Sequence, residues 1–229
     1  MCARLAIVCV LMFSAGMNAA GAEPLPVLYA DDFQKGMDRW APLGDEPSFA
    51  VVDVVGPAGT PTKALRALGN SKYKPPFRSP PNVALLKDLV VGDLELTADV
   101  QSTNSGAGPH RDMCVAFGYQ SPTQFYYVHL GAEPDPHACQ IFIVDDAPRK
   151  AMTAKTSGGT PWTDGWHRVK VVRRLADGWI GVYFDDMETP HLEVHDATFG
   201  PGQVGLGTFD DHGHWDNVEV RGVQVEPAS

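Results

Sequence analysis

A tyrosine and a histidine, Tyr127 and His129, stand two positions apart in a run of aromatic residues. Residues two apart on a β-strand share a face, so both side chains would point into the same space. By the same alternation, Tyr119 and Gln140 on neighbouring strands would join them. A flat aromatic face suits a sugar ring, and a phenol beside an imidazole can exchange protons with a substrate. The array therefore predicts a carbohydrate site with an acid/base pair; the alternative is a packed aromatic face whose polar tips meet water.

A charged triplet, His110-Arg111-Asp112, lies where a loop of small and polar residues enters that aromatic stretch. A His and an Asp beside an Arg could bind or protonate a substrate oxygen, with the guanidinium holding hydroxyls or a carboxylate. A guanidinium from Arg111 or Arg78 could also neutralise the carboxylate of an acidic sugar, which together with the Tyr/His pair would suit β-elimination. The alternative for the triplet is a salt-bridged anchor of the loop.

Several carboxylates could act in hydrolysis or hold a metal. Glu95 and Asp99 share the wet face of one predicted strand, but two repeats of about 6.7 Å separate them, which is long for retaining glycoside hydrolysis. Asp99 is expected to bind substrate instead. Trp162 is also expected to bind substrate, as a platform for a sugar ring. No cofactor is expected to be required, but a structural Ca²⁺ could bind a set of aspartates that would meet if the chain ends pair: Asp31, Asp32, Asp210, Asp211 and Asp216.

Residues 113–144 form three apolar and aromatic runs separated by two polar breaks, which predicts an antiparallel β-meander. If the first turn centres on Pro122, side-chain alternation divides the meander into two faces. One face is small and aliphatic and should pack on a second sheet: Cys114, Ala116, Gly118, Tyr126, Val128, Leu130, Cys139, Ile141 and Ile143. The other is aromatic with polar tips and should line a ligand groove: Met113, Val115, Phe117, Tyr119, Phe125, Tyr127, His129, Gln140 and Phe142.

Short strands and Gly/Pro turns continue along the rest of the chain, with no convincing helical period. The clearest are the alternating run 94–101 and a hairpin in which 166–175 pairs with 179–185 across Asp177-Gly178. The proline-rich segment 72–81 predicts a surface loop. About a dozen such strands predict an all-β fold, a two-sheet antiparallel jelly-roll sandwich.

The first 22 residues predict a secretory signal peptide, with Arg4, an apolar core over 5–13 and the small residues Ala20-Gly21-Ala22. We expect one domain over 23–229, secreted or periplasmic after cleavage near Ala22, and a monomer. The chain has 18 Lys and Arg against 28 Asp and Glu, a net charge of −10, which speaks against nucleic acid and membrane surfaces as partners. Cys114 and Cys139 would lie two strand spacings apart, too far for a disulfide.

Several motifs together carry a family resemblance that spans about residues 30 to 222. They are Asp31-Asp32-Phe33 with Trp40, and the segments 92–96, 104–106, 166–171, 181–186, 202–207 and 215–218. With these motifs the chain resembles the concanavalin A-like lectin/glucanase superfamily, and within it is similar to the 3-keto-disaccharide hydrolase group of secreted bacterial proteins. The resemblance implies a concanavalin A-like jelly roll whose concave sheet binds carbohydrate.

Three functions follow as hypotheses, each with a carbohydrate as partner. The first is a glycoside-cleaving enzyme of the 3-keto-glycoside hydrolase or lyase type. Its acid/base and positioning set would be His129, Tyr127, His110, Arg111 and Asp112, and its substrate-binding set Arg78, Tyr119, Gln140, Trp162 and Asp99. The second is a non-catalytic, lectin-like sugar-binding module that uses the same face. The third is a polysaccharide lyase acting by β-elimination.

Overall fold

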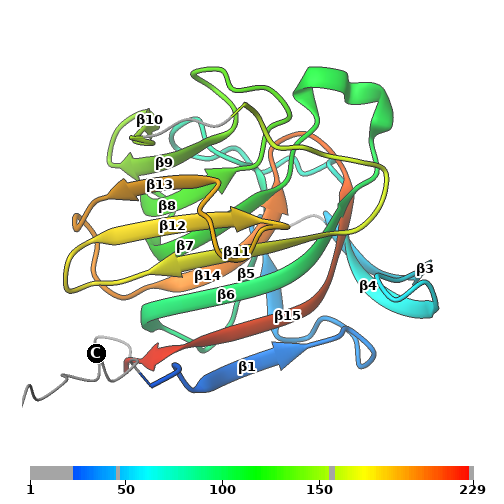
Figure 1. The fold of residues 1–229 in the computed structure, drawn as a ribbon, viewed down its shortest axis with the longest axis horizontal. Helices are drawn as coiled ribbons and strands as arrows, with labels where there is room; N and C mark the ends of the chain where they lie inside the picture. Colours follow the sequence, from blue (N-terminus) through cyan, green and yellow to red (C-terminus); the bar gives the residue numbers. More distant parts are fainter. Residues whose placement is uncertain (1–22, 45–46, 155–157, 227–229) are drawn as a thin grey trace, which may run out of the picture.

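The computed structural model describes residues 23–44, 47–154 and 158–226, so the predicted signal peptide lies outside the described residues. Two antiparallel sheets pack face to face (Figure 1), which confirms the predicted jelly-roll sandwich. In spatial order, sheet A contains β13 (Leu192–His195), β12 (Trp179–Phe184), β11 (His167–Arg173), β6 (Val91–Ser102), β15 (Gly213–Gln224), β4 (Pro61–Ala67) and β3 (Phe49–Val55), with β1 (Val27–Asp31) paired to β15.

Sheet B holds the predicted meander in its centre. In spatial order it contains β10 (Lys150–Ala151), β9 (Gln140–Asp145), β8 (Gln124–His129), β7 (Cys114–Ser121), β14 (Gln203–Thr208), β5 (Asn82–Leu86) and β2 (Trp40–Pro42). A short 3₁₀ segment, η1 (Ser105–His110), precedes β7. Within the described part of the chain, no helix is long and apolar enough to cross a membrane.

The main core lies between the two sheets and follows from strand alternation. In β6, Leu94, Leu96, Ala98 and Val100 are buried, whereas the residues between them are only half-buried. Sheet B contributes Val128 and Ile141, among others, to the same cluster. Removing each such aliphatic side chain from water is worth about 1.5–3 kcal/mol, so the alternating pattern fixes which face of each sheet turns inward.

The predicted faces of the meander are right for β8 and β9 and wrong for β7. Cys114 pairs with His129 and Ala116 with Tyr127, so these two small residues face outward. Val115 and Phe117, together with Met113, face the inter-sheet core instead. Within one strand pair the register fixes every face at once, so an error of one residue inverts the whole strand.

The cause of that inversion is an irregularity in β7 at Gly118. The pairing of β7 with β8 shifts between Phe117 and Ser121, and Gly118 has a φ of 56° in the left-handed region. A side chain in this backbone conformation is strained, and a Cβ here would also stand 2.8 Å from Arg173 Nη1, so the position favours glycine. The bulge returns Tyr119 to the outward side, where the sequence had placed it.

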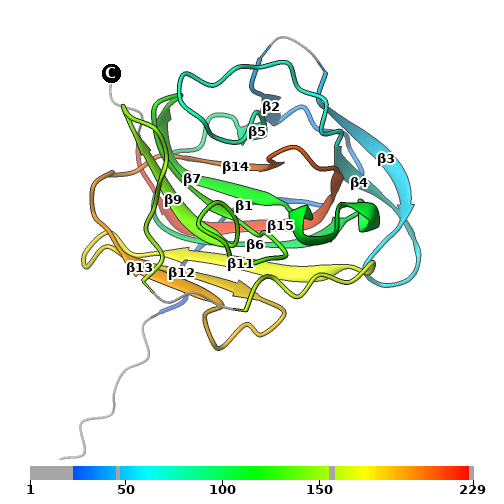
Figure 2. The same ribbon diagram turned by 90° about the horizontal axis from the view of Figure 1, so that it is seen from above.

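The outer face of sheet B is covered rather than open. A second apolar cluster lies on it, with Tyr127, Phe142 and Val144 almost fully buried. The segment 68–81, which joins β4 to β5, crosses outside this sheet and brings Phe77 onto the cluster (Figure 2). The proline-rich run is therefore a loop, as predicted, but it closes over the face that was expected to be a groove.

Cys114 and Cys139 belong to different faces of the meander. Cys114 packs in the outer cluster, whereas Cys139 packs in the inter-sheet core. Their side chains point apart, in agreement with the prediction that no disulfide joins them.

Candidate functional site

An aromatic file runs along the outer face of sheet B. Ring centroids are 5.3 Å apart for Tyr119 and Phe125, 6.1 Å for Phe125 and Tyr127, and 5.0 Å for Tyr127 and Phe142. His129 continues the file toward the β8 end. The prediction that Tyr119, Tyr127 and His129 share a face is confirmed, as it is for Gln140, but all are at most 7% exposed. They form a packed surface beneath a cover rather than the floor of an open groove.

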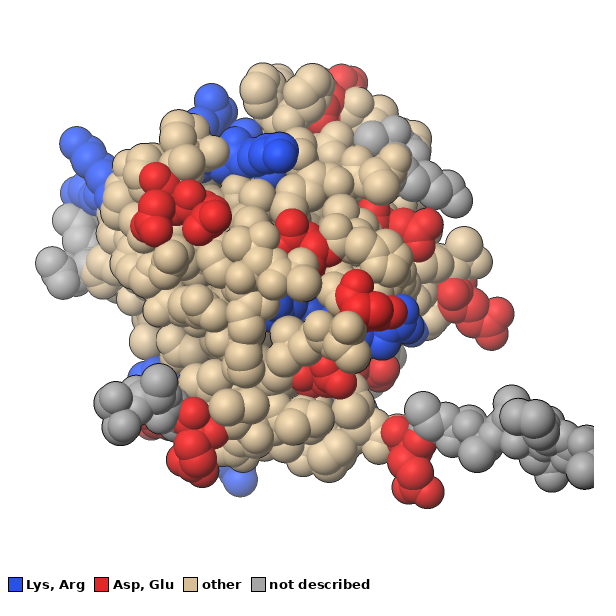
Figure 3. Space-filling model, turned by 90° about the vertical axis from the view of Figure 1, so that its left-hand side faces the viewer, with Lys and Arg blue, Asp and Glu red and all other residues tan. Residues whose placement is uncertain are grey.

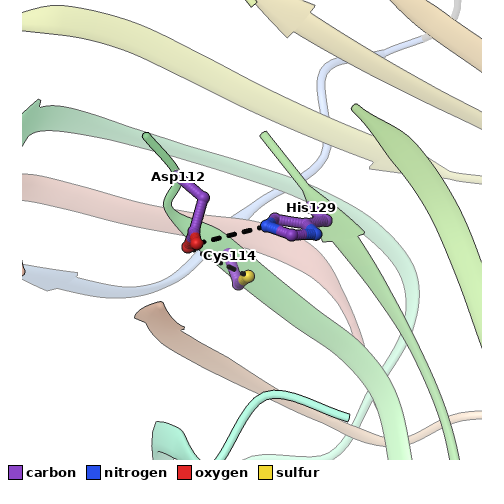
Figure 4. Close-up of side chains that lie close together, drawn as sticks. All are labelled: Asp112, Cys114 and His129. Carbon is purple, nitrogen blue, oxygen red and sulfur yellow. Dashed lines mark hydrogen bonds and ion pairs between the residues drawn. The ribbon is translucent and has the colours of Figure 1, made fainter. Parts of the chain in front are cut away.

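At the end of the file, His129 contacts Asp112 from the residues just before β7. Nε2 of His129 lies 3.3 Å from Oδ2 of Asp112 (Figure 4). The other ring nitrogen, Nδ1, donates to the carbonyl oxygen of His137 at 3.0 Å. Oδ1 of Asp112 accepts hydrogen bonds from Thr208 Oγ1 at 2.8 Å and from the backbone N–H of Phe209 at 2.9 Å. The sequence placed Asp112 and His129 in one site, and the structure brings them together.

Two opposing effects, burial and nearby hydrogen-bond donors, determine the charge state of Asp112. Its near-complete burial would raise the pKa of the carboxyl. The adjacent His129, the N–H of Phe209 and the hydroxyl of Thr208 outweigh that effect and hold the pKa of Asp112 below its usual value. Asp112 is therefore an ionised carboxylate inside an apolar cluster, stabilised by three partners.

Cys114 is the third polar group at this place. Its Sγ lies 4.0 Å from Oδ1 of Asp112 and is fully buried. Burial, and then the negative charge of Asp112, raise the pKa of the Cys114 thiol well above its usual value. The positive charge of Arg149 opposes this rise without cancelling it, so the group is a neutral thiol and a poor nucleophile. Among the described residues, Asp112, Cys114 and His129 form the group whose ligand-type atoms all lie within 4.8 Å of one another.

Arg149, which sequence reasoning missed, lies over these residues. Its guanidinium donates to the hydroxyl of Tyr127 at 2.7 Å and to the carbonyl of His137 at 3.2 Å. It also lies between two rings, 4.5 Å from the centroid of Phe142 and 4.9 Å from that of Phe209. The sequence offered little signal for it, because Arg149 follows a turn whose path decides what it covers.

Two further residues of the predicted site, Arg78 and Tyr127, lie close to this group. The Arg78 guanidinium, on the exposed part of the covering segment, lies 5.6 Å from the Phe209 ring. Burial raises the pKa of Tyr127 even though Arg149 opposes the rise, so Tyr127 is a neutral phenol. Arg78 therefore lies near the predicted site at the protein surface, whereas Tyr127 lies buried within that site.

The other members of the predicted catalytic triplet are not part of this site. His110 is exposed at the end of η1. Arg111 is buried and donates to Ser102 Oγ at 2.9 Å and to the Ser102 carbonyl at 2.7 Å, and it pairs with Asp164 at 3.0 Å. These contacts match the alternative of a salt-bridged loop anchor, and a catalytic role of Arg111 stays a prediction.

Two predicted substrate-binding residues also lie elsewhere. Trp162 donates from Nε1 to the Leu130 carbonyl at 2.7 Å and packs edge-on against Phe184, with centroids 4.9 Å apart. It is half-buried and packs beside the inter-sheet core, away from the aromatic file. Asp99 lies on the outer face of sheet A, where it pairs with Arg168 at 2.9 Å. Gln140 lies on the predicted face, donating to the Asp135 carbonyl at 3.3 Å.

The five aspartates of the expected calcium site divide into two groups. Asp210 and Asp211 lie next to Asp112, whose backbone N–H donates to Asp211 Oδ2 at 3.1 Å. At the other place, burial raises the pKa of Asp216 to about 6, with smaller contributions from neighbouring aspartates, Asp31 and Asp32 among them. The single five-residue site is therefore not assembled in the described structure.

Charge on the molecular surface is dispersed over the face shown in Figure 3. Acidic side chains are spread across it, and several basic ones gather near its upper edge. Although the net charge is −10, a local pair of guanidinium groups, such as Arg78 and Arg149, can create a basic spot on an acidic protein.

No protein-family model and no curated protein sequence matches the chain. Solved structures do. A carbohydrate-binding module from Bacillus subtilis is 17% identical, with a TM-score of 0.57 over 81% of this chain and 96% of that chain. A cellulose-induced protein is 14% identical, with a TM-score of 0.55 over 87% and 100%.

A Bacillus subtilis protein of unknown function with a galectin-like fold is 11% identical, with a TM-score of 0.53 over 89% of this chain and 99% of that chain. At such identities the similarity shows the fold. The two packed antiparallel sheets agree with it. The chain therefore shares the antiparallel β-sandwich fold of this carbohydrate-binding module and of the galectin-like protein.

Proposed function

We propose that this is a secreted carbohydrate-binding protein whose ligand contacts the outer side of sheet B at Phe209, Arg149 and Arg78, here called the Phe209 patch. The observation that carries the proposal is the half-buried ring of Phe209 with two guanidinium groups against it, at 4.9 and 5.6 Å. A ring edge beside fixed donors is a combination that suits a sugar, which has both apolar C–H surfaces and hydroxyls.

The guanidinium of Arg149 is held in place before any ligand arrives. Tyr127 and the His137 carbonyl accept its hydrogen bonds, and two rings enclose it. A group that is already ordered loses little side-chain entropy when it binds. Because Arg donates through a planar fork, it recognises a carboxylate or a pair of hydroxyls well. The patch therefore favours a sugar that carries an acidic group.

Similarity to known folds supports a carbohydrate ligand. One of the similar structures is by name a carbohydrate-binding module. Because fold does not dictate function, the ligand class rests on the chemistry of the patch together with that similarity.

Binding without cleavage is favoured by the burial of the candidate acid/base groups. A general acid must come within about 2.6–3.2 Å of a substrate oxygen. Asp112, Tyr127 and His129 are 1%, 0% and 7% exposed and lie beneath Arg149. Cleavage by a 3-keto-glycoside hydrolase or by a lyase is the second candidate. It is favoured by the Asp112–His129 pair and requires Arg149 to move aside.

Calorimetric titration of the purified protein with neutral and uronic acid-containing oligosaccharides tests the proposal. We expect Phe209→Ala and Arg149→Ala each to weaken binding about tenfold or more, which corresponds to about 1.4 kcal/mol. Arg149→Lys should lie between, because it keeps the charge and loses the fork.

The matched control is a similar pair on the other sheet, where the Arg174 guanidinium lies 4.5 Å from the ring of Trp179. Arg174→Ala and Trp179→Ala should leave binding unchanged. Equal losses at both pairs, or no binding of any oligosaccharide, would overturn the proposal. Product release from the same panel that disappears in His129→Ala would establish cleavage in place of simple binding.

A further inference from the structure

Three side chains of different ligand chemistry converge below the Phe209 patch. Their ligand-type atoms, a carboxylate oxygen of Asp112, the sulfur of Cys114 and a ring nitrogen of His129, lie within 4.8 Å of one another (Figure 4). All three residues are more than nine-tenths buried. They come from the start of β7 and the end of β8, which pair so that Cys114 lies directly opposite His129.

His129 is oriented as metal-binding histidines commonly are. Its Nδ1 donates to the His137 carbonyl at 3.0 Å, which turns Nε2 toward Asp112. Ligating histidines usually donate their second ring N–H to a carbonyl or carboxylate in this way. Within the described residues, Nε2 of His129 is one of the buried nitrogen and oxygen atoms that make no hydrogen bond, although Asp112 Oδ2 is 3.3 Å away.

The two carboxylate oxygens of Asp112 have different partners. Oδ1 is held by Thr208 and by the N–H of Phe209, whereas Oδ2 faces His129. One oxygen is thus fixed by outer partners and the other remains available. Ligating carboxylates are typically hydrogen-bonded through such outer partners.

The spacing of the atoms fits one shared ion. Bonds of about 2.0–2.3 Å at the tetrahedral angle place two ligand atoms roughly 3.3–3.8 Å apart. The Nε2–Oδ2 distance of 3.3 Å lies in this range, and the sulfur of Cys114 lies within 4.8 Å of the other two ligand-type atoms. A contact of 3.3 Å in which Nε2 makes no hydrogen bond is suitable for two ligands of one metal.

We infer that Asp112, Cys114 and His129 bind a divalent transition-metal ion of the Zn²⁺ type. A thiolate and an imidazole suit Zn²⁺, whereas Ca²⁺ and Mg²⁺ take oxygen ligands. The ion replaces the proton of the Cys114 thiol, which is released to solvent, and the lone pair of His129 Nε2 supplies the nitrogen ligand. One thiolate and one carboxylate then neutralise the two positive charges. Three protein ligands leave a fourth position for water or another ligand.

Titration with Co²⁺, a coloured substitute for Zn²⁺, tests the site in the purified protein after chelator treatment. We expect one equivalent to bind with a thiolate-to-metal charge-transfer band that Zn²⁺ abolishes. Cys114→Ser should lose that band and weaken binding at least tenfold, and His129→Gln should weaken it similarly. Affinity should fall as the pH is lowered, because protons compete for both ligands.

The matched control is Cys139→Ser, since Cys139 is buried in the same meander but faces the inter-sheet core. This variant should keep the band and the affinity. A charge-transfer band that persists in Cys114→Ser, or the absence of cobalt binding, would overturn the inference and leave a simple Asp112–His129 ion pair. If Cys114→Ser does not fold, zinc-edge X-ray absorption of the unsubstituted protein decides: one sulfur ligand is expected, and a shell of nitrogen and oxygen alone contradicts the site.

Discussion

The outer faces of the two sheets differ in their exposure: that of sheet A meets water, whereas that of sheet B is covered. On sheet A, half-buried ion pairs and polar ladders meet water, as in Arg168 bonded to Asp99 and Thr97. On sheet B, Tyr127, Phe142 and the Asp112–His129 pair lie under a cover. Both sets point away from the inter-sheet core. The difference teaches that an outward side chain becomes a site or a second core according to what crosses over it.

The largest contrast is expected from removing one carboxylate on each face. Asp112→Ala leaves the Thr208 hydroxyl and the Phe209 N–H without their buried acceptor, and each lost partner costs about 1–3 kcal/mol. Asp99→Ala on sheet A removes a partly exposed pair and should cost at most about 1 kcal/mol. Urea denaturation of both variants measures the free energies of unfolding. Similar losses for the two would show that the cover on sheet B does not seal the pair from water.

A change in pH should alter the stability contributed by the two faces in opposite directions. The lowered pKa of Asp112 on sheet B contributes stability that is present above the unfolded pKa and lost as the pH falls through the folded value. The pKa of Asp216 on sheet A is raised to about 6, so its ionisation costs stability as the pH rises from about 4 to 6.

Asp216→Asn should therefore gain about 1–2 kcal/mol over the parent protein above pH 6, after allowance for solvent screening, and nothing below pH 4. Unfolding curves recorded from pH 4 to 8 provide the comparison. The same gain at every pH would exclude ionisation of Asp216 as its cause.

A smaller difference should separate two buried tyrosines. Tyr127→Phe removes the hydroxyl that accepts from Arg149 at 2.7 Å and should cost about 1 kcal/mol. Tyr183→Phe on the outer face of sheet A serves as the control, because the Lys170 ammonium contacts its ring, 4.0 Å from the centroid, rather than its hydroxyl. It should cost a few tenths of a kcal/mol at most. Thermal unfolding measures both, and a larger loss in Tyr183→Phe would reverse the assignment.

The architecture could be predicted because it depends on local patterns. Alternation in 94–101 and the Asp177-Gly178 turn identified strands that the structure confirms. The short strands β2, β10 and β13 were missed, since two to four residues carry too little pattern. The inversion of β7 came from the irregularity at Gly118, which looks like an ordinary small residue in an apolar run.

The site was predicted in part for a similar reason. Asp112 and His129 are close in sequence and were placed together, as was Tyr127. Phe209 and Arg149 reach the site from the end of β14 and from the turn after β9, so their presence depends on long-range packing. Cys114 was assigned to the wrong face together with the other β7 residues before Gly118, which concealed its place beside His129.

The segment 68–81 has a consequence for the solubility of the protein. It shields an apolar surface built from β7, β8 and β9 that no part of sheet A could cover. If a protease cut that segment, the sandwich core would keep its packing. The molecule would, however, expose a broad apolar patch of the kind that drives self-association. Resistance to aggregation would then depend on a proline-rich segment rather than on the sheets themselves.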